Sequence, residues 1–241
     1  MPTSLPGLDV FAKYWRIRMH DRVTAPYILL MLNNESKFSG RIIRAEATAE
    51  DIAAGMPGAL RTLDVSRING GYIDTSGVDL DILHKFSTDL GDFVPRLSLT
   101  WVNEFRAVDF LGMPGVDRAG TASPFGTVPT WRAIGSIEWR KSFAEVSVDA
   151  RYVPKYYDAS VLGRNGRILP AQTLVDFNVS VDLDSLLGYS GPWHGTTIAF
   201  GVENVFDVPP HHAEVGSVAG LDLSQADLRQ RFCHVTLSKR F

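Results

Sequence analysis

The sequence lacks several features that define common classes of protein. It has a single cysteine, Cys233, so a disulfide framework and a cysteine-based metal site are both excluded. Its longest uninterrupted apolar run, Tyr27–Leu32, is far shorter than the ~20 residues of a membrane-spanning helix. The net charge of −3 does not suggest a nucleic-acid partner. Residues 1–11 carry no basic or apolar region of a signal peptide, so we expect a cytosolic protein or a piece of something longer.

What the sequence does have is a strict alternation of apolar and polar residues. Trp131–Arg140, Ala144–Tyr152 and Val175–Leu183 show it most clearly, and as β-strands each would have one apolar and one polar face. Several of these segments exceed the usual strand length of about five or six residues. The connections between them alternate between short turns, such as Lys141–Phe143, and long loops, such as Leu111–Thr130. We therefore predict an all-β fold of about eight long antiparallel up-and-down strands.

The region after the first predicted strand does not alternate in this way. Two short helices are expected there, Ala25–Leu32 and Ala49–Met56, and Thr48 is a suitable N-cap for the second. Further along, Thr62–Phe86 is predicted as one long strand, and its glycines at Gly70-Gly71 and Gly77 suggest bulges or twist.

Alternation alone does not separate a transmembrane barrel from a soluble sandwich or a lipocalin-like barrel, because all three have one apolar face. Long strands joined alternately by short turns and long loops are typical of an outer-membrane barrel. Aromatic residues near the ends of the apolar faces would suit the lipid interface, and they favour the membrane barrel. These predicted interface aromatics are Trp101, Trp131, Trp139, Tyr152 and Tyr156. An isolated chain of this kind is expected to form an open, curved sheet.

The opposite face of the predicted strands carries charges of both signs, which suits either solvent or a water-filled lumen. We predict that ten residues face the lumen: Glu104, Arg106, Arg132, Glu138, Arg140, Glu145, Asp149, Arg151, Asp176 and Asp182.

No arrangement of residues indicates catalysis. The adjacent His211 and His212 point apart in an extended chain and have no evident third ligand, so a solvated loop is the better interpretation. The carboxylates of Asp79 and Asp81 share a face, but no nucleophile accompanies them. We therefore expect no enzyme, no catalytic residue, no metal site and no cofactor.

Several stretches, taken together and in order, carry a resemblance to a known family. They are Ile68–Gly71, Thr75–Leu80, Val128–Arg132, Ala150–Asp158, Val202–Asp207 with Pro209-Pro210, and the terminal Phe241. The chain resembles the C-terminal barrel region of TonB-dependent outer-membrane receptors. This resemblance implies that residues 1–241 correspond to the last eight of 22 strands, and that the plug domain and the earlier strands are absent. It also implies that Phe241 is a C-terminal membrane-insertion signal read by the barrel-assembly machinery.

The resemblance further implies a role in active transport at the bacterial outer membrane. Such a receptor binds a scarce ligand (siderophore, haem, cobalamin or saccharide) and imports it with energy relayed by the TonB complex through the plug. The ten charged residues would then contact the plug or line the path, and outer-membrane lipid would surround the apolar face. Two alternatives remain open: a small stand-alone outer-membrane barrel with a structural or adhesive role, and a soluble ligand-carrier barrel.

Overall fold

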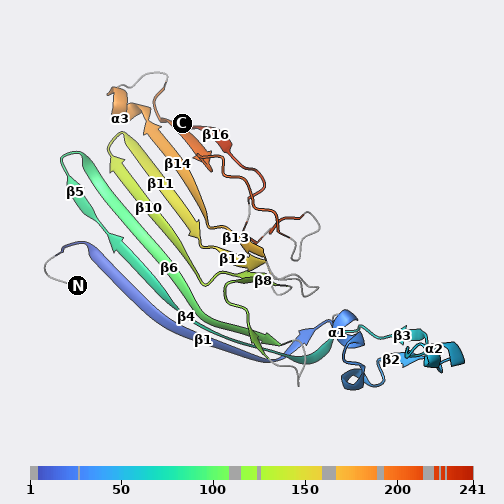
Figure 1. Cartoon of the computed structure of the whole chain (residues 1–241). Helices are drawn as coiled ribbons and strands as arrows, with labels where there is room; N and C mark the ends of the chain where they lie inside the picture. The colour runs from blue at the N-terminus through green and yellow to red at the C-terminus, as the bar shows by residue number, and fades with distance from the viewer. Residues whose placement is uncertain are drawn as a thin grey trace. The chain divides into compact units, whose positions relative to one another are not determined.

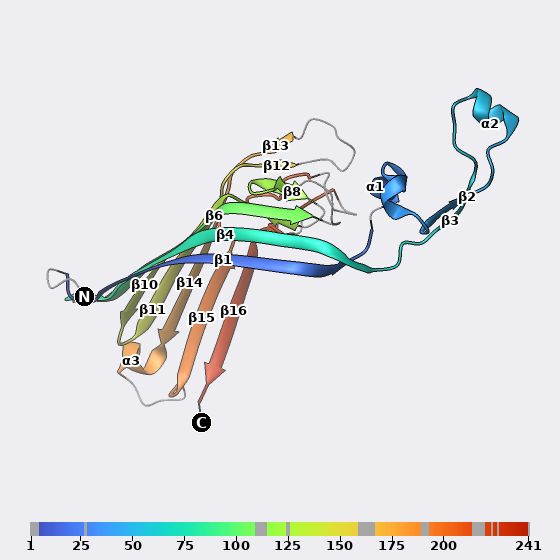
Figure 2. The ribbon, with the colours of Figure 1, turned by 90° about the horizontal axis from the view of Figure 1, so that it is seen from below.

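The computed structural model describes residues 5–26, 28–108, 115–123, 126–158, 167–188, 193–213, 220–222, 224–225 and 227–240. Most strands belong to one sheet, which we call the main sheet, with the order β1-β4-β6-β10-β11-β14-β15-β16 (Figures 1 and 2). These strands are β1 (Leu8–Thr24), β4 (Ile68–His84), β6 (Gly91–Val108), β10 (Trp131–Lys141), β11 (Ala144–Val153), β14 (Gln172–Asp182), β15 (Thr196–Glu203) and β16 (Phe232–Lys239). The predicted all-β fold of about eight long up-and-down strands is confirmed. The sheet is open, since β1 and β16 stand at the two ends of this order.

Two short strands, β5 (Phe86–Thr88) and β7 (Val116–Asp117), pair with β6 beside this path. The chain as a whole divides into two compact units. Unit 1 comprises Met1–Ile17, Thr75–Phe105 and Asp117–Phe241, and unit 2 comprises Arg18–Asp74 and Arg106–Val116.

The strand register brings the apolar residues of neighbouring strands to the same face. Ile137 of β10 lies opposite Val148 of β11, which in turn lies opposite Phe177 of β14. One residue along each strand, Ser136 lies opposite Asp149. Because side chains alternate along a strand, a slip of one residue would exchange the two faces throughout. The observed register keeps them apart, as the sequence pattern predicts.

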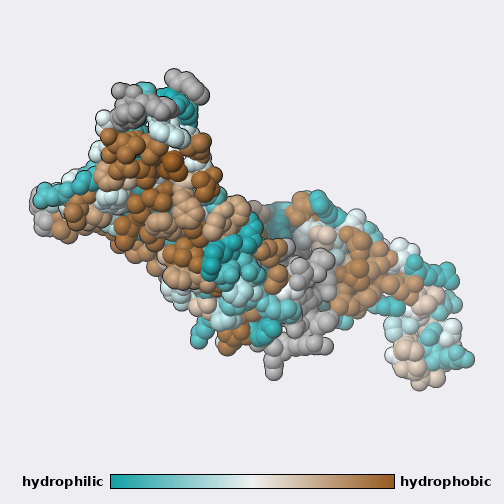
Figure 3. All heavy atoms as spheres, turned by 90° about the horizontal axis from the view of Figure 1, so that it is seen from above, coloured by the Kyte–Doolittle hydropathy of each residue, from teal (hydrophilic) through white to brown (hydrophobic). Residues whose placement is uncertain are grey.

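No second layer covers the apolar face among the residues that the structure describes. The side chains of Ile137, Val148 and Val235 are 55%, 40% and 71% exposed. Figure 3 shows apolar residues gathered in a broad patch over the main sheet. A soluble sandwich would bury such residues between two sheets. The sheet is instead a single layer whose apolar face lacks a protein partner within the described residues.

On β1 the largest aromatic ring, that of Trp15, faces the opposite side of the sheet from the apolar patch. The indole of Trp15 lies over Gly77 of β4, where an added Cβ would come within 2.4 Å of the ring. Because Gly77, Asp79 and Asp81 alternate on one side of β4, Trp15 lies on the charged face. The same Cβ would lie 2.3 Å from the backbone carbonyl oxygen of Trp101, so glycine is required at position 77. β4 runs through Gly70, Gly71 and Gly77 as one strand, but the single strand predicted over Thr62–Phe86 is divided, because Leu60–Leu63 forms a separate strand, β3.

A second, smaller sheet is built from connections that the sequence predicts only as loops. Its order is β13-β12-β8-β9, with β8 (Thr121–Ser123), β9 (Gly126–Val128), β12 (Tyr156–Asp158) and β13 (Arg167–Leu169). We call these four strands, with residues 211–213, 220–222 and 224–225, the loop body. Its core is the buried cluster of Ala122, Tyr156, Leu169 and Ala213. These strands are too short for alternation to reveal them. In addition, β8 and β12, which pair with each other, belong to different connections of the main sheet.

Unit 2 contains most of the connection between β1 and β4. Its elements are α1 (Ile28–Leu32), the 3₁₀ helix η1 (Glu35–Phe38), β2 (Ile42–Arg44), α2 (Ala49–Ala53) and β3 (Leu60–Leu63). Met31 and Phe38 are buried against Leu30, Ile42, Leu63 and Ile68. Both predicted helices are present but shorter than expected. The N-cap at Thr48 is confirmed, and with Asp51 it forms a capping box. In the described part of the chain, no helix is both long enough and apolar enough to cross a membrane.

Candidate functional site

The predicted lumen-facing residues lie almost entirely on one face of unit 1. On β10, β11 and β14 the register places them together: Arg140 is opposite Glu145, and Asp149 is opposite Asp176. Arg132 is opposite Thr100 of β6, so Glu104, four residues further along β6, shares this polar face. The exception is Arg106, which belongs to unit 2. The polar face of the main sheet is therefore a continuous charged surface over four strands of unit 1.

Some of these charges are paired with one another. Arg151 Nη2 lies 2.9 Å from Asp176 Oδ2, and Arg140 forms ion pairs with Glu138 and with Glu145. Arg140 and Arg151 are substantially exposed, so each pair contributes about 1 kcal/mol or less. Asp182 has a different role from the predicted one, because it caps the short helix α3 (Leu183–Leu187) by accepting a hydrogen bond from the Ser185 N–H.

At the long-connection end, a single carboxylate holds the loop body together. Asp222 accepts hydrogen bonds from Thr127 Oγ1 at 2.6 Å, Tyr156 Oη at 2.8 Å, and the hydroxyl and backbone N–H of Ser224 at 2.6 and 3.0 Å. The donors come from three connections far apart in the sequence. Burial by itself would raise the pKa of Asp222, but the bonds from Ser224, Thr127 and Tyr156 hold it below the usual value. Burial and the Asp222 carboxylate together raise the pKa of the Tyr156 phenol, which therefore remains a donor at neutral pH.

The Val202–Asp207 run, which carries the most specific part of the resemblance, forms a tight turn at the end of β15. Asn204 is buried and left-handed at φ 51°, a conformation that asparagine tolerates better than most residues. Its side-chain amide donates to the Val208 carbonyl and accepts from the Val208 N–H, both at 2.9 Å. Its backbone N–H donates to Asp176 Oδ1 at 2.8 Å. Asp176 thus connects this turn to Arg151 on the neighbouring strand.

Four of the five predicted interface aromatics lie on the apolar face of the main sheet. Trp101 is opposite Trp131, and Trp131 stacks on Tyr152 with ring centroids 4.8 Å apart. At the other end of β10, the indole of Trp139 donates to the Leu90 carbonyl at 3.0 Å. The prediction for Tyr156 is wrong, because its ring is buried in the loop body and its hydroxyl is bound to Asp222. Phe241 lies outside the described residues.

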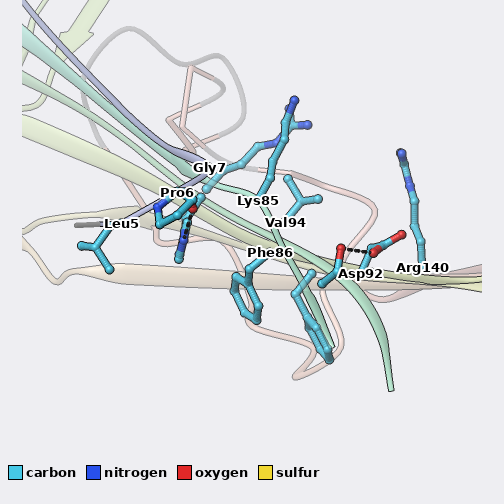
Figure 4. A pocket seen from close by; sticks show the side chains of 12 residues that line it. Leu5, Pro6, Gly7, Lys85, Phe86, Asp92, Val94 and Arg140 are labelled. Carbon is cyan, nitrogen blue, oxygen red and sulfur yellow. Dashed lines mark hydrogen bonds between the residues drawn. The ribbon is translucent and has the colours of Figure 1, made fainter. Parts of the chain in front are cut away.

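The short-turn end of the main sheet has a cavity of about 820 Å³ beside Leu5, His84 and the β5–β6 turn (Figure 4). Figure 4 shows Lys85, Val94 and Arg140 on one side of the strands and Phe86 on the other. Phe86 stacks on Phe93, with ring centroids 5.5 Å apart, on the apolar face. The division between a charged and an aromatic face therefore extends to the last residues of the hairpin.

No sequence pattern indicates the role of Asp222, because the three connections that carry its hydrogen-bond donors meet only in the folded chain. Among the described residues, no group of three or more histidine, cysteine, aspartate or glutamate side chains could hold a metal ion. His212 lies beside Arg167, whose guanidinium is 3.0 Å from His212 Nδ1.

Comparison with solved structures shows what fold this is. The chain is similar to the FrpB iron transporter from Neisseria meningitidis (F3-3 variant), with a TM-score of 0.51 and 13% identity over 84% of this chain and 25% of that one. It is also similar to a mutant of the ferric enterobactin receptor PfeA from Pseudomonas aeruginosa. In that case the TM-score is 0.56 and the identity 11%, over 98% of this chain and 29% of that one. What the likeness shows is the fold: long antiparallel up-and-down strands in an open sheet, similar to part of the fold of these two proteins.

The chain spans less than a third of the length of these two proteins. Comparisons with protein-family models and with curated proteins find no match. The likeness therefore concerns the fold, and it agrees with the resemblance to TonB-dependent receptors found in the sequence. The two solved structures are described as a transporter and a receptor rather than as enzymes.

Proposed function

We propose that this chain is the C-terminal part of the barrel of an outer-membrane active transporter that imports a scarce ligand with energy relayed by TonB. The ligand is a siderophore, haem, cobalamin or a saccharide. In this proposal, residues 1–241 provide the last strands of a larger barrel, and a plug supplied from elsewhere lies against the polar face. Phe241 would guide insertion by the barrel-assembly machinery.

One observation carries the proposal: the single-layered main sheet has an uncovered apolar face and a charged face on opposite sides. β10, β11 and β14 have 11, 10 and 11 residues, which suits strands of about 9–11 residues across a bilayer. A water-soluble carrier would have to cover the apolar face, and a closed eight-stranded barrel would need β1 and β16 to pair. The larger receptor barrel requires neither.

The orientation of the two faces can be tested with tryptophan fluorescence in bilayers. In one variant Trp101 is the sole tryptophan, and in the other Trp15 is; the remaining tryptophans are replaced by phenylalanine. Both chains are reconstituted in vesicles with and without brominated acyl chains, which quench a nearby indole. We expect strong quenching of Trp101, on the apolar face, and several-fold weaker quenching of Trp15, which lies over Gly77 on the charged face. Equal quenching of the two, or none, would contradict the proposed orientation.

Transport itself is tested in cells that carry the complete parent gene. We expect a deletion of the segment encoding β10–β16 to abolish uptake of ⁵⁵Fe supplied as the enterobactin chelate, and a protonophore to abolish uptake by the intact protein. The chelate is chosen because one of the two similar structures is a ferric enterobactin receptor. If uptake is unchanged by the deletion, the same assay is run with labelled cobalamin, haem and maltodextrin. Unchanged uptake of all four contradicts the transport role.

A further inference from the structure

A pocket of about 170 Å³ opens on the polar face of the main sheet, next to the loop body. Its floor is apolar, formed by Ile134 of β10 and Leu174 of β14, both of which lie opposite Arg151 in the register. The side chains of Arg132 and Arg151 flank this floor, and Ser224 and Gln225 line it from the loop body.

The hydrogen-bonding capacity of the two arginines is not used up. Arg151 binds Asp176 through Nη2, but its Nε is buried and has no hydrogen-bond partner among the described residues. Arg132 makes no ion pair within the described part of the chain. A buried donor without an acceptor costs about 1–3 kcal/mol. Because the Arg151 Nε is buried and its Nη2 binds Asp176, the donors that an acceptor group entering the pocket meets are mainly those of Arg132, and Arg151 adds its positive charge.

The loop body fixes the third side of the pocket. The Ser224 hydroxyl and backbone N–H both bind the buried carboxylate of Asp222, which also binds Thr127 and Tyr156. The Gln225 N–H donates to the Asp222 carbonyl at 3.2 Å. Ser224 and Gln225 are thus held in place before any ligand arrives, and such preorganisation lowers the entropic cost of binding.

We propose that this pocket binds the carboxylate of a ligand between Arg132 and Arg151, with the adjoining carbon atoms of the ligand on Ile134 and Leu174. A guanidinium is planar and matches a carboxylate through two parallel hydrogen bonds. The volume is below the ~300–1,000 Å³ of pockets that enclose a whole drug-sized ligand, so this pocket takes one functional group of a larger molecule. The inference deepens the proposed function, and it rests on that function for the claim that a ligand reaches this face.

The test uses benzoate and its neutral isostere benzamide as probes, with the whole chain refolded in detergent micelles. Saturation-transfer NMR and calorimetry measure binding. We expect benzoate to bind and benzamide to bind at least 10-fold more weakly. In Arg132→Gln, benzoate affinity should fall at least 10-fold. The matched control is Arg96→Gln. It removes an exposed arginine of β6 that lies on the same face of the sheet as Arg132, and it should leave the affinity for benzoate unchanged.

A second variant, Ile134→Trp, fills the pocket without changing its charge and should also abolish benzoate binding. Circular dichroism verifies that each variant has the strand content of the parent chain, and only variants that pass are compared. Equal binding of the two probes would mean that the carboxylate charge contributes nothing, and equal losses in Arg132→Gln and Arg96→Gln would mean that net charge alone attracts benzoate. Either result would overturn the proposal. Benzoate binding does not depend on bromolipid quenching or on ⁵⁵Fe uptake, so the proposed function and this inference can fail separately.

Discussion

The main sheet, which lies mostly in unit 1, and the loop body, which lies wholly in unit 1, are both built of β-strands, yet they are stabilised differently. The loop body buries an apolar cluster and a carboxylate with four hydrogen bonds inside itself. The main sheet has backbone pairing and exposes its apolar side chains, with Val235 at 71% and Leu237 at 65%. The loop body therefore has its own core, whereas the sheet depends on its surroundings. Lipid on one face and polar partners on the other would complete it.

The largest expected effect comes from placing a charge on the apolar face. Val148 lies mid-strand between Ile137 and Phe177, so Val148→Arg should destabilise the chain in bilayers by about 2–4 kcal/mol. Urea unfolding in vesicles measures this difference. The matched control is Ser147→Arg, one residue away on the polar face, for which we expect little change. Similar losses for the two variants would show that the faces do not differ in environment.

A smaller effect is expected in the loop body when its central acceptor is removed. Asp222→Ala leaves Thr127, Tyr156 and Ser224 without their acceptor, and we expect a local loss of about 1–3 kcal/mol. Hydrogen exchange of the β8, β9 and β12 amides should accelerate, while that of β10 and β11 stays unchanged. Asp89→Ala, an exposed carboxylate in the β5–β6 turn, is the control. Faster exchange throughout the main sheet would contradict the independence of the two regions.

The turn at Asn204 joins the two regions, and its loss should cost less. Asn204→Ala removes both side-chain bonds to Val208 and places alanine at a positive φ, and together these should cost about 1–2 kcal/mol. Asn204→Gly relieves the backbone conformation but not the lost bonds, so it should recover part of this loss. Thermal unfolding of the three chains in detergent measures the series. Equal stability of the alanine and glycine variants would mean that the backbone conformation contributes nothing.

The smallest effect is expected from pH, and it should be confined to the loop body. The pKa of Asp222 is held below its usual value in the folded chain, so its contribution is complete above the unfolded value of about 3.9. That contribution is lost as the pH falls through the lower folded value. Protease cleavage in the loop body should therefore be constant from about pH 8 to 5 and increase below about pH 4. Pepsin measures cleavage in the acid range and subtilisin measures it near neutral pH, each rate being divided by that of the same protease on an unfolded substrate at the same pH. Asp222→Asn is the control.

The main sheet was predictable from sequence, and the loop body was not, for a physical reason. The strands that contain Ile137, Val148 and Phe177 are long enough for alternation to define both of their faces. Short turns such as Lys141–Phe143 also show which strands are neighbours. β8 and β12 have three residues each and pair in parallel across separate connections, which no local pattern records. For the same reason the sequence pattern places Tyr156 at the lipid interface: it shows an aromatic residue near a strand end, but it does not show that Asp222 will bind the hydroxyl of that residue.

Within the candidate site, the placement of Arg132, Glu138 and Asp149 on one face followed from the sequence. The pocket between Arg132 and Arg151 did not, because it depends on Ser224 and Gln225 returning from a distant connection. Asp182 illustrates a further limit: a carboxylate at the end of an alternating strand can belong to the face or can cap the helix that follows, and here it caps α3.

The segment between β1 and β4 has a consequence for how such proteins diversify. It encloses Met31 and Phe38, ties Arg44 to Glu35 at 2.6 Å and caps its own helix at Thr48. A connection that satisfies its own apolar and polar groups can exchange residues, or change length, without shifting the register of the strands that it joins. We therefore expect sequence variation to accumulate in this segment while the sheet keeps its pairing.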